Sequence, residues 1–275
     1  MTAKGLIGAV ALSSVVWSCL ICASVITLTA CASNATSTSM NSDLVTDSDE
    51  PDTRKRARLR LELAVAYFDK GQTTDALDHL KQSILADPNL FEAYNLRGLI
   101  YMRLNDVPVA EESFRRALAI NPKAASVQHN YGWLLCQQAR LPEAVQLFGS
   151  ALANPNYGDR AKTWMAQGLC QQKNGQNVDA EASLLRSYEL DAGNPITAYN
   201  LSLLLFQRAE FVRSQFYIRR LNNSELANAE SLWLGIKVER RLDNRDATLQ
   251  LGAQLKKRFP QSREYLAFER GAFNE

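Results

Sequence analysis

Few side chains in this sequence could carry covalent or acid–base chemistry. The 275 residues include five cysteines and two histidines, His79 and His129. The sequence has no His-Glu-x-x-His, no Gly-x-Ser-x-Gly and no phosphate-binding loop, and Cys19 and Cys22, although spaced like a redox motif, lie in an apolar N-terminal segment. We therefore expect a protein that is not an enzyme and uses neither a cofactor nor a metal. The formal net charge is +2, and residues 54–275, with 30 basic and 24 acidic residues, are only mildly basic. This is far from the clustered positive charge of a nucleic-acid binder, and no small-molecule substrate is expected.

Cys31 has a different chemical context. Residues 1–30 have the layout of a secretory signal, with one basic residue, Lys4, before an apolar run that ends near Leu28. The sequence Leu28-Thr29-Ala30-Cys31 resembles the lipobox of bacterial lipoproteins, which implies removal of residues 1–30 and acylation of Cys31. An uncleaved transmembrane anchor is the alternative, since the run approaches the length of a span. The small residue before Cys31 and the polar segment after it favour the lipobox.

The residues after Cys31 indicate where the lipid would take the protein. Ala32 rather than Asp follows the cysteine, and by resemblance to lipoproteins of two-membrane bacteria this implies sorting to the outer membrane, facing the periplasm. Residues 31–53 are rich in Ser, Thr, Asn and Asp. They are expected to carry the acylated cysteine on a disordered tether with a root-mean-square reach of roughly 25 Å.

A stretch of 34 residues, Phe91 to Ala124, organises the rest of the chain. Counted from Phe91, it places Gly98 and Ala110 at positions 8 and 20, large apolar residues at positions 4, 11 and 24, and Pro122 at position 32. This pattern resembles a tetratricopeptide repeat. The resemblance implies two helices that approach closely at the small residues. Because one such unit cannot bury its own apolar face, the stretch predicts neighbouring copies.

Five further copies align with this stretch, starting near residues 57, 125, 161, 196 and 228. In the fifth copy, Leu203 and Gln215 replace the two small residues, so either its packing differs or its register is displaced. Tyr265, Leu266 and Phe268 predict a capping helix within residues 261–275. The predicted fold is all-α, a right-handed superhelix of about six tetratricopeptide repeats over residues 54–260, followed by this cap.

Cys136 and Cys170 fall at positions 12 and 10 of successive first helices. In this fold the first helices lie parallel and side by side. Residues that face each other across parallel helices differ by about half a turn, which two residues provide. Since the periplasm is oxidising, a disulfide between the two cysteines is predicted, and two buried free thiols are the alternative.

The first helices of tetratricopeptide repeats line a concave groove, and the resemblance implies that positions 2, 5, 9, 12 and 13 face it. Position 9 is apolar in all six copies, while positions 5 and 13 add amides and bases. The predicted partner-binding residues are Asn95, Leu99, Met102, Arg103, His129, Trp133, Met165, Leu169, Asn200 and Leu204. Such a surface suits an extended or helical peptide with some acidic residues, unless position 9 packs against the second helices instead.

The lipobox, the polar tether and six repeats filling a small chain resemble the outer-membrane lipoproteins of type IV pilus biogenesis. The segments Tyr94-Asn95-Leu96-x-Gly98 and Asn130-Tyr131-Gly132-Trp133-Leu134 add to the likeness. This resemblance implies a pilotin, which brings subunits of the pilus secretin to the outer membrane and supports their assembly into a multimeric ring. The alternative is a periplasmic scaffold for another envelope machine, such as outer-membrane protein assembly or peptidoglycan synthesis.

Overall fold

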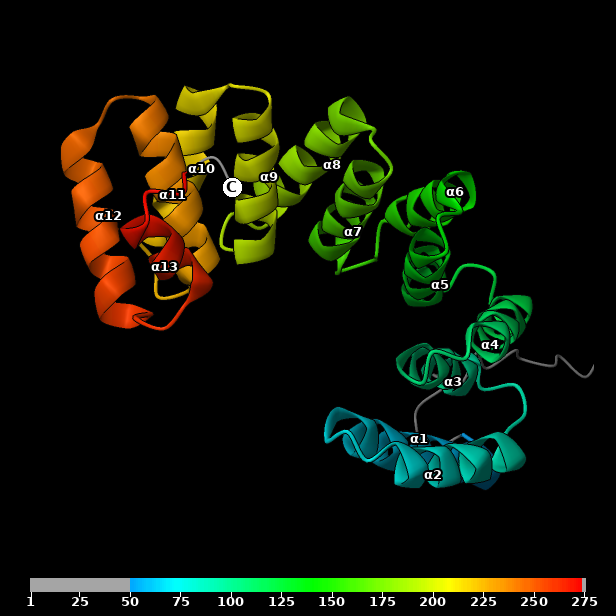
Figure 1. The fold of residues 1–275 in the computed structure, drawn as a ribbon. Helices are drawn as coiled ribbons and strands as arrows, with labels where there is room; N and C mark the ends of the chain where they lie inside the picture. Colours follow the sequence, from blue (N-terminus) through cyan, green and yellow to red (C-terminus); the bar gives the residue numbers. More distant parts are fainter. Residues whose placement is uncertain (1–49, 274–275) are drawn as a thin grey trace, which may run out of the picture. The chain divides into compact units, whose positions relative to one another are not determined.

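The computed structural model describes residues 50–273. The predicted signal peptide, Cys31 and residues 32–49 of the predicted tether lie outside the described residues. Thirteen helices and no strand occur in residues 50–273 (Figure 1), which confirms the all-α prediction. The helices are α1 (Asp52–Asp69), α2 (Thr73–Ala86), α3 (Phe91–Arg103), α4 (Val107–Ile120), α5 (Ala125–Gln137), α6 (Leu141–Leu152), α7 (Arg160–Lys173), α8 (Asn177–Leu190), α9 (Pro195–Gln207), α10 (Phe211–Asn222), α11 (Ala229–Arg241), α12 (Arg245–Arg258) and α13 (Arg263–Glu269).

The helices form successive pairs. Each odd-numbered helix up to α11 packs on the even-numbered helix that follows it, and also on the next odd-numbered helix. Figure 1 shows these pairs following one another along the chain. The short helix α13 contacts both α11 and α12, so the last pair does not leave its apolar flank open to water.

Glycine makes the close crossing within a pair possible. A Cβ atom added to Gly98 would lie 2.5 Å from the ring of Phe114, and one added to Gly132 would lie 2.9 Å from the ring of Phe148. Both rings are fully buried. A side chain at position 8 would therefore displace the large residue at position 24 from a close-packed interior.

The turns between paired helices fix the register of all six repeats. Each turn contains one residue in the left-handed region, namely Gly71, Asn105, Ala139, Gly175, Ala209 and Asp243. These residues recur every 34 residues, apart from 36 residues between Ala139 and Gly175. The residue that follows each of them is the N-cap of the second helix. By this register the fifth repeat begins at residue 195 and the sixth at residue 229, one residue away from their expected starts at 196 and 228.

The corrected register restores small residues to the crossing of the fifth pair. Ser202 and Ser214 take positions 8 and 20, and both are fully buried. Their hydroxyl oxygens lie 2.8 Å apart, and the hydroxyl of Ser214 donates to the backbone carbonyl of Ser202 at 2.8 Å. Leu203 and Gln215, one residue further along, are only partly buried. The fifth pair is therefore a regular repeat that uses serine where the first four use glycine or alanine.

The sixth pair inverts the usual sizes. Position 8 is Ile236, which is fully buried, and position 24 is Gly252. A Cβ atom on Gly252 would lie 2.3 Å from the ring of Phe268 on α13. The space that a large residue at position 24 fills in other repeats is thus taken by Phe268 of α13. This explains why sequence alignment to the glycine at residue 235 displaces the repeat by one.

Candidate functional site

The first helices of the pairs carry a row of partly exposed apolar side chains at position 9. In the first four repeats these are Val65, Leu99, Trp133 and Leu169, and Val65 is 40% exposed. Leu99, Met102 and Trp133 each pack against the core formed by residues of α4, α5, α6 and α7. The row is therefore half in the core and half in solvent, the condition in which a side chain can still lose apolar surface to a partner.

The structure brings several predicted site residues to this face. Asn95, Met165 and Leu169 are partly buried, like Leu99, Met102 and Trp133. The side-chain oxygen of Asn95 accepts a hydrogen bond from the amide of Asn130 on α5 at 3.0 Å. The amide nitrogen of Asn95 makes no such bond to the described part of the chain, so it remains available to a peptide carbonyl.

Arg103 is exposed, but its guanidinium is committed to a neighbouring repeat. It donates to the backbone carbonyl of Phe68 at 2.7 Å and lies 3.7 Å from the centre of the Phe68 ring. Arg103 thus caps the end of α1 and covers an apolar ring that the groove would otherwise expose. A role in joining the first two repeats accounts for this geometry.

The prediction that His129 faces the groove is wrong. Its side chain is buried, and its Nδ1 lies 2.8 Å from the hydroxyl of Thr163 on α7, which in turn lies 2.9 Å from the hydroxyl of Tyr157. Burial, helped by the charge of Lys162, lowers the pKa of His129 to about 4. The physical reason is the packing of α7 against α5, which places Thr163 on His129, while the longer α6–α7 connection supplies Tyr157 as the second partner of Thr163.

The prediction for Leu204 is also wrong, and Asn200 takes position 6 instead of position 5, because the register of the fifth repeat is displaced by one residue. Leu204 is fully buried, and the amide of Asn200 donates to the backbone carbonyl of Ile196 on its own helix at 2.8 Å. The residues that take positions 5, 9 and 12 are Tyr199, Leu203 and Phe206, and all three are partly exposed. Asn194, whose side chain caps α9 ahead of Pro195, is the sequence feature that marks the correct start.

Two further residues of this face were missed in the sequence. In the sixth repeat, position 5 is Trp233 and position 9 is Lys237. The ammonium of Lys237 lies 5.7 Å from the centre of the Trp233 ring and 5.8 Å from that of Phe206. Burial holds the pKa of Lys237 below its usual value. The apolar row of position 9 therefore ends in a cation.

Cys136 and Cys170 form a disulfide between α5 and α7, with their Cα atoms 5.7 Å apart. Both side chains are buried. The bridge links the third and fourth repeats, the same junction that holds the His129–Thr163 contact. In the structure the two cysteines therefore have a stabilising role.

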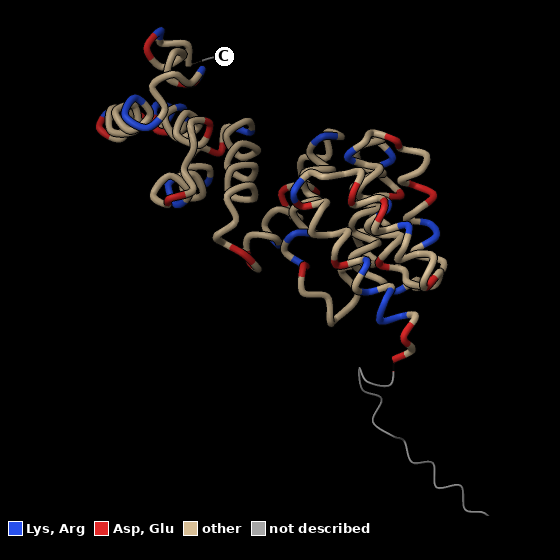
Figure 2. Tube along the Cα trace, turned by 90° about the horizontal axis from the view of Figure 1, so that it is seen from below, with Lys and Arg blue, Asp and Glu red and all other residues tan. Residues whose placement is uncertain are grey.

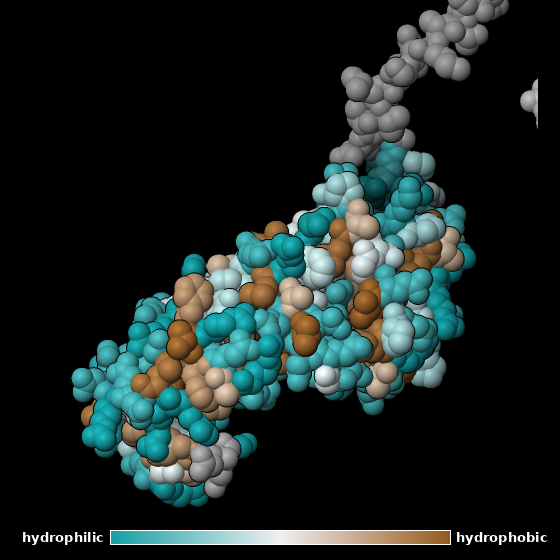
Figure 3. All heavy atoms as spheres, turned by 90° about the horizontal axis from the view of Figure 1, so that it is seen from above, coloured by the Kyte–Doolittle hydropathy of each residue, from teal (hydrophilic) through white to brown (hydrophobic). Residues whose placement is uncertain are grey.

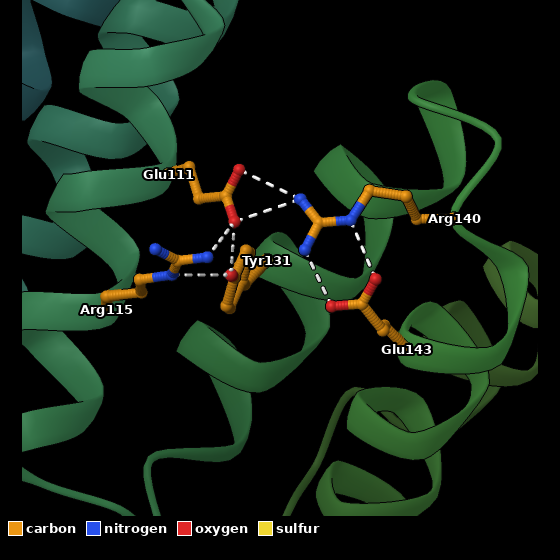
Figure 4. Close-up of polar contacts among 5 residues, drawn as sticks. All are labelled: Glu111, Arg115, Tyr131, Arg140 and Glu143. Atoms are coloured by element: carbon orange, nitrogen blue, oxygen red, sulfur yellow. Dashed lines mark hydrogen bonds and ion pairs between the residues drawn. The ribbon is translucent and has the colours of Figure 1, made fainter.

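A carboxylate network joins the second repeat to the third (Figure 4). Glu111 on α4 accepts two hydrogen bonds from Arg140, both at 2.9 Å, and one from the hydroxyl of Tyr131 at 2.8 Å. Arg140 also pairs with Glu143 at 2.6 Å. Burial by itself would raise the pKa of Glu111. The hydrogen bonds from Arg140 and Tyr131, with the charges of Arg115 and Arg140, outweigh it, and the pKa lies below its usual value.

A second network of the same kind joins the fourth repeat to the fifth. Its centre is Glu181, which occupies position 21 as Glu111 does, and which pairs with Arg208 and Arg213. Both arginines also pair with Glu210. Arg208, like Arg103, is therefore held between repeats.

Charges of both signs are intermixed along the helices (Figure 2). Figure 3 shows a face on which apolar residues occur singly or in small groups among polar ones. Within residues 50–273 no group of His, Cys, Asp and Glu is arranged to hold a metal ion. No helix of the described segment is both long and apolar enough to cross a membrane. The chemistry available on the face is thus that of apolar contact, amide hydrogen bonding and a few charges.

The fold matches those of known proteins. A tetratricopeptide repeat family model matches residues 61–125, which confirms the repeat type. The chain is 28% identical over 209 residues to the type IV pilus assembly protein PilF of Pseudomonas aeruginosa, covering 76% of this chain and 83% of that protein. The crystal structure of PilW, described as a widely conserved type IV pilus biogenesis factor, matches with a TM-score of 0.69 and 30% identity over 77% of this chain and 97% of PilW. The P. aeruginosa PilF structure matches with a TM-score of 0.72 and 27% identity, covering 80% of this chain and all of PilF (100%). Such a repeat fold is typical of proteins that bind other proteins rather than of enzymes.

Proposed function

Because this chain belongs to the family of the type IV pilus biogenesis factor PilW, we propose that it acts in type IV pilus assembly as a non-enzymatic outer-membrane lipoprotein. Its partner in this proposal is the pilus secretin. The relationship to PilW extends over 97% of that chain, so the proposal draws on the whole repeat array rather than on one shared motif.

The observation that carries the proposal is the row of half-exposed apolar residues at position 9. Leu99 and Trp133 pack against the core on one side and are partly exposed on the other, and Leu169 is also partly exposed. A segment of the secretin would lay its apolar side chains along this row, and the free amide of Asn95 would hold a backbone carbonyl. Rigid helices keep the row in place before the partner arrives, which lowers the entropic cost of binding.

Acylation of Cys31 gives the array its location in this proposal. A soluble array of repeats has no preference for a membrane, whereas two or more acyl chains anchor a protein stably. The protein would follow the lipoprotein sorting route to the outer membrane, facing the periplasm, with a secretin segment bound. Holding several subunits at that membrane would promote their multimerisation.

A deletion strain tests the proposal. We expect secretin subunits to remain unassembled or in the wrong membrane, with loss of pili, when membranes are separated on a density gradient and secretin is detected in each fraction. Cys31→Ala should mislocalise the protein and the secretin together. Normal secretin multimers in the outer membrane of the deletion strain would overturn the proposal. Capture of outer-membrane protein assembly or peptidoglycan synthesis components instead would favour the alternative scaffold.

A further inference from the structure

The last repeats carry a half-buried cation on the same face as the apolar row. Lys237 on α11 lies beside Trp233 on the same helix and Phe206 on α9. Trp233 is itself fixed, because Phe273 stacks on it with ring centres 5.4 Å apart. Position 9, which is apolar in the five preceding repeats, is therefore a lysine beside two aromatic rings in the sixth repeat.

The ammonium of Lys237 has no anionic partner within residues 50–273. Its recorded contacts are the two rings, whereas the carboxylate of the buried Glu239, also on α11, pairs with Arg219 at 2.6 Å. A partly desolvated ammonium that lacks a hydrogen-bond acceptor is costly, and the cost falls when a carboxylate binds it. The low pKa of Lys237 comes from burial alone, as this geometry requires.

Two adjoining hollows open beside this lysine, and both are lined by Trp233, Lys237 and Glu264. The smaller hollow, of about 190 Å³, extends over Tyr199 and Leu203 of α9. Its wall on this side is aromatic and aliphatic, and its volume suits a single apolar side chain. Lys237 lies at the boundary between this wall and the second hollow.

The larger hollow, of about 380 Å³, lies against α13 and is lined by Arg263, Leu266 and Arg270. Neither arginine forms an ion pair within the described segment of the chain. Three cations thus surround this hollow, and Glu264 is the carboxylate among its lining residues. The excess of positive charge favours an anionic group there.

We propose that Lys237 forms a subsite for an Asp or Glu side chain of a bound peptide, with a neighbouring apolar side chain of the peptide packed on Tyr199, Leu203 and Trp233. The three N–H donors of the ammonium would make charge-assisted hydrogen bonds to the carboxylate. This inference rests on the proposed function, in which a secretin segment occupies the same face. It adds that the segment has an acidic residue beside an apolar one where it reaches α11.

The surrounding carboxylates distinguish a peptide from a polyanion. Glu230 lines the smaller hollow and Glu264 lines both, so a phosphate backbone would meet repulsion on either side of Lys237. A peptide with a single acidic residue places only one negative charge there and meets less of this repulsion. Its backbone N–H groups could donate to Glu230 or Glu264, because both carboxylates lack ion-pair partners within residues 50–273.

The test uses the full chain purified in detergent and two sets of fluorescein-labelled peptides measured by fluorescence polarisation. One set tiles the periplasmic part of the secretin from the same organism, and the other consists of random-sequence peptides of the same length. Each peptide is paired with a version in which Asn and Gln replace Asp and Glu. The variant is Lys237→Met, which keeps the aliphatic stem on the rings, and the control is Lys257→Met on the exposed side of α12.

For the wild type and the control, we expect the amide versions to bind about tenfold more weakly than the acidic peptides, the effect of one charged hydrogen bond of about 1.4 kcal/mol. Lys237→Met should bind both versions equally weakly. If Lys237→Met still distinguishes the two versions as the wild type does, the subsite is wrong.

The two peptide sets separate failure of the subsite from failure of the proposed function. If acidic random-sequence peptides bind through Lys237 but no secretin peptide binds, the subsite stands and the secretin is not the partner. If secretin peptides bind with equal strength in their acidic and amide versions, the partner stands and the subsite falls. Labelled oligothymidine that binds the wild type and is lost in Lys237→Met would overturn the assignment to a peptide. Melting curves by circular dichroism should show that Lys237→Met remains folded.

Discussion

The imidazole of His129 lies 2.8 Å from the hydroxyl of Thr163, which is 34 residues further along the chain. The same two helices, α5 and α7, are joined by the disulfide between Cys136 and Cys170, which are also 34 residues apart. The first helices of the third and fourth repeats are thus joined at two points along their length, once by a buried polar contact and once by a covalent bond. No other junction within residues 50–273 has a disulfide.

The first prediction concerns pH and His129. Its pKa is about 4 in the folded chain and 6.5 as a free side chain, so the unfolded chain binds more protons between these values. The free energy of unfolding should therefore fall as pH drops below 6.5 and level off near 4, by up to about 3 kcal/mol in total. Urea titrations at pH 7 and pH 4.5 should show a smaller loss for His129→Gln than for the wild type. An equal loss in both would mean that His129 is accessible to protons in the folded state.

The second prediction concerns the disulfide. Mass spectrometry after alkylation under non-reducing conditions should leave Cys136 and Cys170 unmodified in protein taken from the periplasm. Reduction should lower the free energy of unfolding by about 4 kcal/mol, because the unfolded chain is no longer constrained by a closed loop of 34 residues. A Cys136→Ser, Cys170→Ser double variant is the control and should be indifferent to reductant. Complete alkylation of the mature protein without reductant would rule out the bridge.

The third prediction concerns Glu111, whose carboxylate joins α4 to Arg140 and Tyr131. Glu111→Gln should reduce the free energy of unfolding by about 1–2 kcal/mol, since it leaves a partly buried guanidinium with weaker acceptors. Because the pKa of Glu111 is lowered on folding, this stabilisation is present at neutral pH and is lost as pH falls through the folded pKa. Glu189→Gln, in the exposed pair with Arg186, is the matched control and should change little. Equal losses for the two variants would argue against the network.

The fourth prediction concerns the turns. Ala139 and Ala209 have φ of 58° and 60°, whereas the first and fourth repeats have glycine at the same place. Ala139→Gly and Ala209→Gly should each stabilise the chain by about 0.5–1 kcal/mol, because relief of the strained left-handed backbone exceeds the added flexibility of glycine. Gly71→Ala should have the opposite effect. Thermal unfolding followed by circular dichroism decides this, and a loss of stability in the two glycine variants would contradict the turn geometry.

The fifth prediction concerns the apolar row. Leu99→Ala and Trp133→Ala should weaken capture of the secretin in a pull-down while leaving the helical signal at 222 nm and its melting transition close to the wild type. Leu134→Ala is the matched control, since its side chain is buried beside Trp133 and its truncation should cost about 2–5 kcal/mol of stability. If Leu99→Ala and Trp133→Ala lose as much stability as Leu134→Ala, both residues belong to the core.

The sequence was sufficient for the helix pairs and for four of their six registers. Glycine or alanine at positions 8 and 20 is a strong local pattern, and in the second, third and fourth repeats it stands against a large residue at position 24. In the last two repeats the same steric requirement is met by Ser202 and Ser214, and by Ile236 with Gly252. A rule based on residue type misses these solutions, because the packing requires only that the two volumes fit.

The candidate face was less predictable, because it depends on contacts between repeats. The position of His129 alone gives no indication that it will be buried against Thr163, which Tyr157 contacts in turn. Lys237 was hidden by a one-residue displacement, since the register shift moved Ile236 into its place. The left-handed turn residues would have revealed the shift, but the φ angle of Asp243 cannot be known from its residue type alone.

The two carboxylate networks have a consequence for the order of the repeats. Glu111 and Glu181 hold the same position in the second and fourth repeats, yet the residue that caps the second helix of the following repeat is Arg140 in one case and Glu210 in the other. If the fifth repeat followed the second, Glu210 would take the place of Arg140 beside Glu111, and Arg208 and Arg213 would supply the cations, as they do for Glu181. A reordered array would therefore keep a paired carboxylate at this junction, but through arginines at other positions of the repeat.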